Sequence, residues 1–275
     1  MSQLSVNFAL NHMTCPQMSA EELIGSAARL GIKAVELRND LGENSLTERS
    51  RARSIAELAK QKGIEILSIN ALYPFNLWNE ERAEQAEKLA MLAAACGARG
   101  LVLCPLVDAH FSASDEEKSI GLTKALKALN AILAAHQLKG FVEPLGFPAS
   151  SLRTKRQVVD TIKERSLENR FLLVHDTFHH QGAGENEVFA THTGLVHISG
   201  VEDEAIGFSD MQDAHRLLVG PKDRLNTVGQ IRQLLSSGYD QFISFESFAK
   251  EIRDLDDPMA AVEQSIRYIQ QKIAG

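Results

Sequence analysis

The sequence predicts a (β/α)₈ barrel, the TIM-barrel fold of the α/β class. Short apolar runs of strand length alternate eight times with longer segments of helical period. The apolar runs are nearly continuous, as is typical of parallel strands whose outer face is covered by helices. No stretch rich in Pro, Gly and Ser divides the chain, so we expect a single domain over residues 1–275.

The first four strand–helix units are marked by helix caps. The first helix follows Ser19, with Glu22 three residues later in capping-box spacing, and it stops at Gly31. The next two helices stop at Gly63 and Gly97. The expected strands of this half are 4–11, 33–39, 64–72 and 99–106, and the expected helices are 20–30, 45–62, 80–96 and about 115–137.

The second half repeats this alternation. An open, doubly wound sheet is less favoured, because Asn11-His12-Met13-Thr14 follows the first strand where a glycine-rich turn is needed. The stretch from Gly200 to Asn226 is long enough to indicate a functional loop. The expected strands are 140–146, 171–178, 194–200 and 241–247, and the expected helices are 153–166, about 184–191, 226–237 and 259–273.

The composition narrows the function classes. The formal net charge of −7 argues against nucleic-acid binding, which needs a basic surface. The amino terminus does not resemble a signal peptide, and no apolar run approaches the roughly 20 residues of a membrane span. The three cysteines, Cys15, Cys96 and Cys104, are too scattered for disulfides or a zinc ribbon and are expected to be apolar fillers. We therefore expect a cytoplasmic protein.

Four polar residues stand at the ends of the last four expected strands: Glu143, Asp176, His197 and Glu246. The carboxyl ends of barrel strands converge on one face, so these side chains should meet there. Three carboxylates and an imidazole suit Mn²⁺, Mg²⁺, Co²⁺ or Zn²⁺, with positions left open for substrate oxygens. Each residue alone could be a strand or helix cap, or the partner of another side chain. Together they favour a metal site.

Further polar groups are expected around the same rim. His179 should lie close enough to bind a substrate hydroxyl, whereas His180 is as readily a loop residue. The long loop should fold over the barrel mouth and supply a cation for a substrate oxygen. Its candidate residues are Asp213, His215, Arg216, Asp223 and Arg224. Candidates from strands two and three are Glu36, Arg38, Asn70 and Phe75, of which Arg38 and Phe75 are as readily surface or packing residues.

Several of these segments resemble the xylose-isomerase-like TIM-barrel superfamily of sugar isomerases and epimerases, over the full chain. The segments are SINALYPFN (68–76), CPLV (104–107), VEPLGFP (142–148), VHDTFHHQGAG (174–184), VHISGVEDEAIGF (196–208) and SFESF (244–248). Within the superfamily, the stretch Val201–Phe208 is most similar to the inosose isomerases of inositol catabolism. One departure is Lys222, where a small residue is usual in a glycine-rich turn.

The resemblance implies a metal-dependent isomerase that moves a ketone along a cyclic polyol or sugar through a cis-enediolate. It implies metal ligation by Glu143, Asp176, His197 and Glu246, with Mn²⁺ the expected ion, and proton transfer by Glu143 and Glu246. Substrate contacts are expected from His179, Arg216, Arg224 and Asn70. The partner is then a small polyol ketone or sugar, with neither nucleic acid nor membrane involved, and a homodimer is left open.

Other functions fit the same barrel. A ketose 3-epimerase or a dehydroshikimate-type dehydratase would use the same metal. An apurinic-site DNA endonuclease is less favoured, because strand three ends in Asn70-Ala71 where that chemistry needs histidines, and because the net charge is negative. A barrel that binds a sugar without converting it is also consistent with the sequence.

Overall fold

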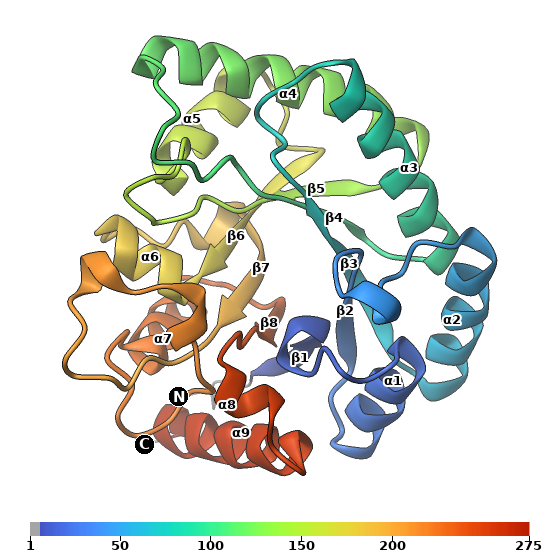
Figure 1. Ribbon diagram of the computed structural model, residues 1–275, viewed down its shortest axis with the longest axis vertical. Coiled ribbons are helices and arrows are strands. Elements are labelled where there is room, and N and C mark those ends of the chain that lie inside the picture. Colours follow the sequence, from blue (N-terminus) through green and yellow to red (C-terminus); the bar gives the residue numbers. More distant parts are fainter. Residues whose placement is uncertain (1–5, 275) are drawn as a thin grey trace.

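The computed structural model describes residues 6–274 and shows eight parallel strands closed into a barrel with helices around it (Figure 1). Each strand pairs with its neighbours in chain order, and β8 pairs with β1. The predicted (β/α)₈ barrel is therefore confirmed. The strands are β1 Asn7–Asn11, β2 Ala34–Arg38, β3 Glu65–Leu72, β4 Gly100–Leu103, β5 Lys139–Val142, β6 Phe171–Asp176, β7 Thr193–Ile198 and β8 Phe242–Phe245.

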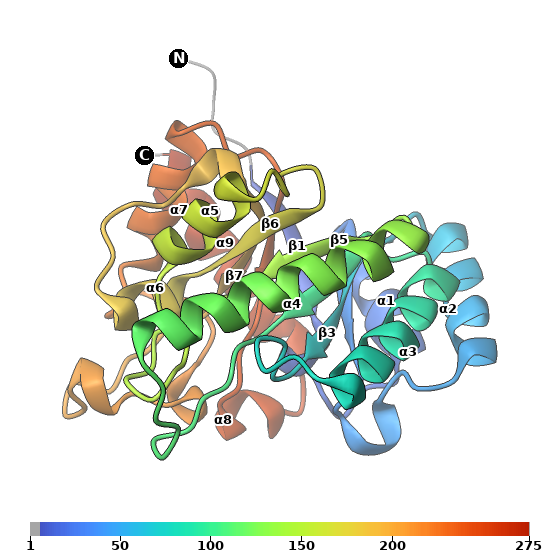
Figure 2. The same cartoon turned by 90° about the horizontal axis from the view of Figure 1, so that it is seen from above.

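The first expected strand began at residue 4, and residues 4 and 5 lie outside the described part of the chain, as do the first three residues and residue 275 of the expected domain. The helices cover the outside of the barrel, with α3 and α4 side by side (Figure 2). Within residues 6–274, none of them is long and apolar enough to cross a bilayer. They are α1 Ala20–Arg29, α2 Arg49–Lys62, α3 Glu80–Cys96, α4 Asp115–Ala135, α5 Lys155–Glu164, α6 Thr177–Ala183, α7 Thr227–Ser236, α8 Lys250–Arg253 and α9 Pro258–Ala274.

The caps read from the sequence mark where helices begin and end. Ser19 and Glu22 form the expected capping box at the start of α1, each side chain accepting a hydrogen bond from the other residue's backbone N–H. Gly63 and Gly97 follow α2 and α3 in the left-handed conformation, with φ of 67° and 71°. A side chain would be strained in that conformation, which is why glycine stops these helices.

The helix expected at 184–191 is wrong. The chain instead forms α6 directly after β6, and residues 184–191 contain no more than the start of a 3₁₀ turn, Ala190–His192. Asp176 causes the early start, because its Oδ1 accepts hydrogen bonds from the N–H groups of Phe178 at 2.7 Å and His179 at 3.0 Å. The segment then stops at Gly184, whose φ is 69°.

Two layers of apolar side chains stabilise the barrel. The larger one packs between the strands and the surrounding helices. The smaller one fills the barrel interior with one residue from each of the first seven strands: Ala9, Ala34, Leu67, Val102, Phe141, Val174 and Leu195. Because side chains alternate along a strand, the residue two positions further on also points into the barrel in these strands, except in β3, where a register shift leaves Ile69 in the outer core. This alternation places polar side chains as a layer above the inner apolar one.

Candidate metal centre

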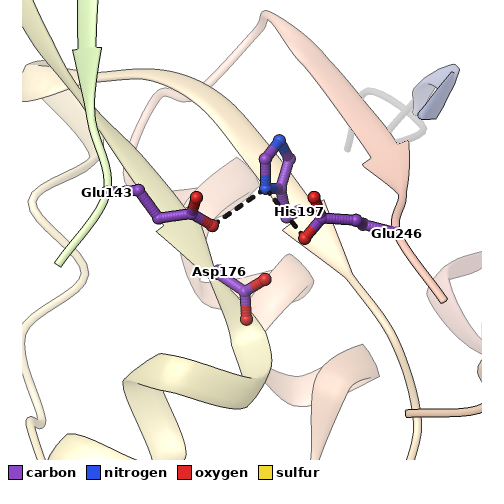
Figure 3. Close-up of side chains that lie close together, drawn as sticks. All are labelled: Glu143, Asp176, His197 and Glu246. Atoms are coloured by element: carbon purple, nitrogen blue, oxygen red, sulfur yellow. Dashed lines mark hydrogen bonds and ion pairs between the residues drawn. The ribbon is translucent and has the colours of Figure 1, made fainter. Parts of the chain in front are cut away.

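The four predicted metal ligands lie in this polar layer, at the carboxyl ends of β5 to β8. Glu143 follows β5, Asp176 ends β6, His197 lies next to the end of β7, and Glu246 follows β8. All four are buried, and one ligand atom from each lies within 4.8 Å of all the others (Figure 3). The structure therefore brings together the complete set that the sequence singled out.

The imidazole of His197 is oriented by carboxylates on both of its nitrogens. Nδ1 lies 3.0 Å from Oε1 of Glu143 and 3.3 Å from Oε2 of Glu246, and Nε2 lies 3.1 Å from Oε1 of Glu36. With its proton on Nε2 and donated to Glu36, His197 presents the Nδ1 lone pair to the other ligands. This carboxylate–histidine arrangement is typical of metal-binding histidines.

Electrostatics at His197 favour a cation. Burial lowers the pKa of His197, but the surrounding carboxylates, Glu246 first, then Glu36 and Glu143, raise it well above its ordinary value. A field that holds a proton on a buried imidazole also attracts a metal ion to the same lone pair. Proton and metal would therefore compete for Nδ1.

Glu36 is held in place by polar side chains from neighbouring strands. Its Oε2 accepts hydrogen bonds from Ser68 Oγ at 2.7 Å and Asn70 Nδ2 at 3.0 Å, and its Oε1 accepts one from Asn11 Nδ2 at 3.3 Å. Burial opposes ionisation of Glu36, yet the charge and hydrogen bond of His197 lower its pKa to about 2. Glu36 is thus an ionised residue that positions His197, and Asn70 supports it.

Arg216 connects the long loop between Gly200 and Asn226 to two of the predicted metal ligands, Asp176 and Glu246. Its buried Nη2 donates to Asp176 Oδ2 at 2.5 Å and to Glu246 Oε2 at 2.9 Å, and its Nε donates to Ser199 Oγ at 3.1 Å. Burial raises the pKa of Asp176, but Arg216 beside it gives a net lowering. For Glu246, burial is likewise outweighed by His197 and Arg216, which lower its pKa to about 2.

The charges of the buried site fit a divalent cation. Glu36 and the three ligand carboxylates are buried beside two buried guanidiniums, Arg38 and Arg216. With His197 neutral, the four buried carboxylates and the two guanidiniums leave two negative charges, apart from the half-exposed Asp40 and Asp213, which pair with Arg38 and Arg216. Uncompensated buried charge is costly, and one divalent ion would balance it. The oxygen-rich donor set also suits Mn²⁺, Mg²⁺, Co²⁺ or Zn²⁺.

A cavity of about 410 Å³, which we call the metal cavity, opens beside the ligands. Asn70, His179 and Arg216, three of the predicted substrate contacts, line it, and so do Glu143 and Glu246. Its other lining residues include Arg38, Asn39, Asp40, Ala71, Tyr73, Cys104, Leu145, Phe147, Asp213 and Phe248. The volume and the convergent polar groups are those of a small-molecule site.

Arg224, the fourth predicted substrate contact, does not line the metal cavity. Its Nη1 donates to the backbone carbonyls of Asp203 and of Ile206, the latter at 2.8 Å, and its guanidinium lies 5.2 Å from the ring centroid of Phe208. Arg224 therefore links parts of the long loop to one another. Its contact with substrate stays a prediction.

The other candidate residues of the sequence also lie outside the metal cavity, except Arg38 and Asp213. Phe75 is fully buried in the outer core, and His180 Nδ1 accepts a hydrogen bond from Lys155 at 2.5 Å. His215 Nδ1 accepts a hydrogen bond from the N–H of Gln212. Asp223 accepts backbone hydrogen bonds from Val201, Leu225 and Thr227. These residues shape the loops around the cavity.

Cys104 and Phe248 are cavity residues that the sequence did not indicate. Cys104 was expected to be an apolar filler, but its thiol donates to Glu143 Oε2 at 3.3 Å, and burial, followed by Glu143, raises its pKa well above the ordinary value. The signal was its position directly after β4, level with Glu143. Phe248 packs under the guanidiniums of Arg38 and Arg216, at 5.9 and 4.6 Å from its ring centroid.

Comparison with known proteins gives the same fold. The family model described as xylose isomerase-like TIM barrel matches residues 24–272. A xylose isomerase domain containing protein from Salmonella typhimurium LT2 is 32% identical, with 99% of each chain covered and a TM-score of 0.86.

More distant solved structures share the fold alone. The IolI protein with a bound zinc atom is 21% identical, with 98% of this chain and 99% of that chain covered and a TM-score of 0.85. A D-psicose 3-epimerase with D-tagatose from Clostridium cellulolyticum H10 is 12% identical, with 98% and 100% covered and a TM-score of 0.78. A search of curated proteins found no match. By its family model and its 32% identical relative, the chain belongs to the xylose isomerase-like TIM barrel family.

Proposed function

We propose that the chain is a single-domain, divalent-metal-dependent isomerase that moves a ketone by one carbon along a cyclic polyol or sugar. Inosose is the substrate we favour and Mn²⁺ the metal. The observation that carries the proposal is the convergence of Glu143, Asp176, His197 and Glu246, with one ligand atom from each within 4.8 Å of the others, beside a cavity lined by further polar groups. Membership of a family of sugar isomerases and epimerases supports this class of reaction.

The four predicted metal ligands would hold a cation that activates the substrate ketone. A divalent cation held by Glu143, Asp176, His197 and Glu246 would polarise the substrate ketone and stabilise negative charge on its oxygen. In Asp176, Oδ1 caps α6, and Oδ2 accepts a hydrogen bond from Arg216, whose Nη2 also donates to Glu246 Oε2.

We assign proton transfer to Glu143 and Glu246, which point toward each other from the ends of β5 and β8 with His197 between them (Figure 3). One carboxylate takes the proton from the hydroxyl-bearing carbon next to the ketone, which gives an enediolate. A proton is returned to the former carbonyl carbon, and the hydroxyl proton moves between the two oxygens. The ketone is thereby displaced by one position with no net change in atoms.

The remaining cavity residues orient the substrate. Arg216 places a buried positive charge beside Asp176 and Glu246, where negative charge develops during the reaction. His179 is 4% exposed and lines the cavity, so its imidazole is available to a substrate hydroxyl. Asn70 acts through Glu36, which it holds against His197.

The test is to incubate the protein with Mn²⁺ and scyllo-inosose in D₂O and to follow the carbonyl position and deuterium uptake by NMR. We expect the ketone to move and solvent deuterium to appear at the carbons flanking it. Glu246→Gln should abolish both signals in a folded protein, whereas Glu251→Gln, on the outer helix α8, should leave them intact. Lack of both signals with every keto-polyol tried, in metal-loaded protein, would refute the proposal.

The same measurement separates the alternatives. A ketose 3-epimerase would invert one carbon next to the ketone and leave the ketone in place. A dehydratase would release one water, which mass spectrometry detects. Both would use the same carboxylates for proton removal, so the product and not the Glu246→Gln variant distinguishes them.

A further inference from the structure

A second cavity, which we call the side cavity, adjoins the metal cavity. It has a volume of about 170 Å³ and lies between the loop after β5, helix α6 and the loop after β7. Phe147 and His179 line both cavities. Their rings meet edge to face with centroids 5.0 Å apart, so the two side chains form a shared wall. A ligand that reaches past this wall would contact both spaces.

The walls of the side cavity are mostly apolar. Phe178, Met211 and Leu225 are almost fully buried there, and Phe147 and Phe208 contribute two further aromatic rings. These side chains come from three different loops or helices, and most of them form one packed cluster. Such a lining favours an apolar group and disfavours a sugar hydroxyl, which would lose its hydrogen bonds to water.

The guanidinium of Arg153 in the wall is held by backbone carbonyls. Arg153 donates Nη2 hydrogen bonds to the carbonyls of Gly146 and Gly182, each at 3.0 Å, and an Nε hydrogen bond to Gly146 at 3.3 Å. Gly146 lies so close to α6 that a Cβ there would be 2.2 Å from the carbonyl oxygen of His179. The close contact between Gly146 and α6 and the hydrogen bonds of Arg153 thus form one side of the cavity. The Arg153 guanidinium is fixed there by these hydrogen bonds.

Exposed apolar side chains gather at these two cavities. In residues 6–274, four large apolar side chains are exposed, and two of them, Tyr73 at 47% and Phe208 at 44%, line the metal cavity and the side cavity, respectively. Exposed apolar surface beside a cavity is typical of a ligand contact. In the shared wall, Nδ1 of His179 is buried without a hydrogen-bond partner among the described residues.

From these observations we infer that the site accepts, beyond unsubstituted inosose, keto-polyols whose ring carries an apolar substituent, an aryl or short alkyl group. This inference rests on the proposed function, because it places the ring in the metal cavity and the substituent in the side cavity. The size agrees with one aromatic ring, since a cavity of about 150 Å³ in another protein holds benzene. The side cavity thereby determines specificity while the metal cavity performs the reaction.

The test uses two probes that differ only in the substituent, the O-methyl and O-benzyl ethers of one keto-cyclitol. Calorimetry on the Mn²⁺-loaded protein should show that the benzyl ether binds about tenfold more tightly, because its ring leaves water. Ser209→Trp, which fills the side cavity from its exposed edge, and Phe208→Ala, which removes a wall, should each reduce that preference at least threefold. Matched controls are Ala205→Trp on the same loop and Leu255→Ala at another exposed apolar side chain, and both should keep it.

Equal binding of the two ethers, or a preference that survives both cavity variants, would overturn the inference. The binding measurement needs no turnover, so its result is separate from that of the proposed function. A benzyl preference without ketone migration would reject the isomerase and keep the side cavity as a binding site. Ketone migration without a benzyl preference would support the isomerase and reject the side cavity as a substrate-binding site.

Discussion

Glu36 and His197 form a buried pair across the barrel interior, with Oε1 of Glu36 3.1 Å from Nε2 of His197 and both side chains inaccessible to solvent. They come from β2 and β7, strands that are not neighbours in the sheet. The pair determines which nitrogen of His197 faces Glu143 and Glu246. Glu36 therefore orients a predicted metal ligand without being one of the four predicted ligands.

Replacing Glu36 should weaken metal binding without unfolding the protein. In Glu36→Gln the amide is a poorer acceptor for the Nε2 proton, so His197 is held less firmly and its Nδ1 is less basic. Loss of such an outer partner typically costs 10- to 100-fold in metal affinity. Titration calorimetry with Mn²⁺ measures the change, and Glu57→Gln on the outside of α2 is the control. Unaltered affinity in Glu36→Gln would contradict this role.

Metal binding should stabilise the folded chain. A ligand present at 100 times its dissociation constant and bound to the folded state alone adds about 2.7 kcal/mol to the free energy of unfolding. We expect that gain for Mn²⁺ in urea unfolding of the wild type, and its loss in His197→Ala. Metal analysis should find one ion per chain. If His197→Ala gained as much as the wild type, the ion would lie elsewhere.

Cys104 should affect the rate more than substrate binding. Its thiol donates to Glu143 Oε2 and so orients the Oε1 that lies 3.0 Å from His197. Cys104→Ala removes the donor and should lower kcat several-fold with little change in KM. Cys104→Ser keeps a donor and should recover most of the rate. Steady-state kinetics with the favoured keto-polyol gives both values, and an equal loss in the two variants would indicate a packing role instead.

The buried Lys155 should make stability depend on pH. Its ammonium faces His175 of β6, His180 of α6 and Glu185, and burial lowers its pKa from 10.5 to about 8. Between these values the unfolded chain binds more protons than the folded chain, so the free energy of unfolding should rise with pH. The expected gain from about pH 7.5 to 9.5 is at most about 2 kcal/mol.

The rise in the free energy of unfolding with pH is measured by comparing variants. Urea unfolding of the metal-free wild type and of Lys155→Met should show it in the wild type alone, because the variant lacks the titrating group. Lys163→Met, on the exposed face of α5, should follow the wild type. Parallel pH dependence in the wild type and Lys155→Met would contradict the lowered pKa.

Local sequence signals located most of the secondary structure, but they misplaced one helix beside the site. Capping residues and glycines in the left-handed conformation are properties of a few adjacent residues, so they can be read directly, as at Ser19 and Gly63. The helix after β6 was misplaced because capping and metal ligation by Asp176 were treated as alternatives. In the structure Asp176 Oδ1 caps α6 while the same side chain lies among the predicted metal ligands.

The barrel and the convergence of Glu143, Asp176, His197 and Glu246 could be predicted from the sequence alone. Eight strand–helix units predict the fold. In a parallel barrel the carboxyl ends of the strands lie at one face, independently of the conformations of the loops. Three features emerge only from the folded structure: Glu36 orients His197, Arg216 and not Arg224 reaches Asp176 and Glu246, and a side cavity lies behind His179. These features depend on loop paths and side-chain packing between distant residues, for which the sequence has no periodic signal.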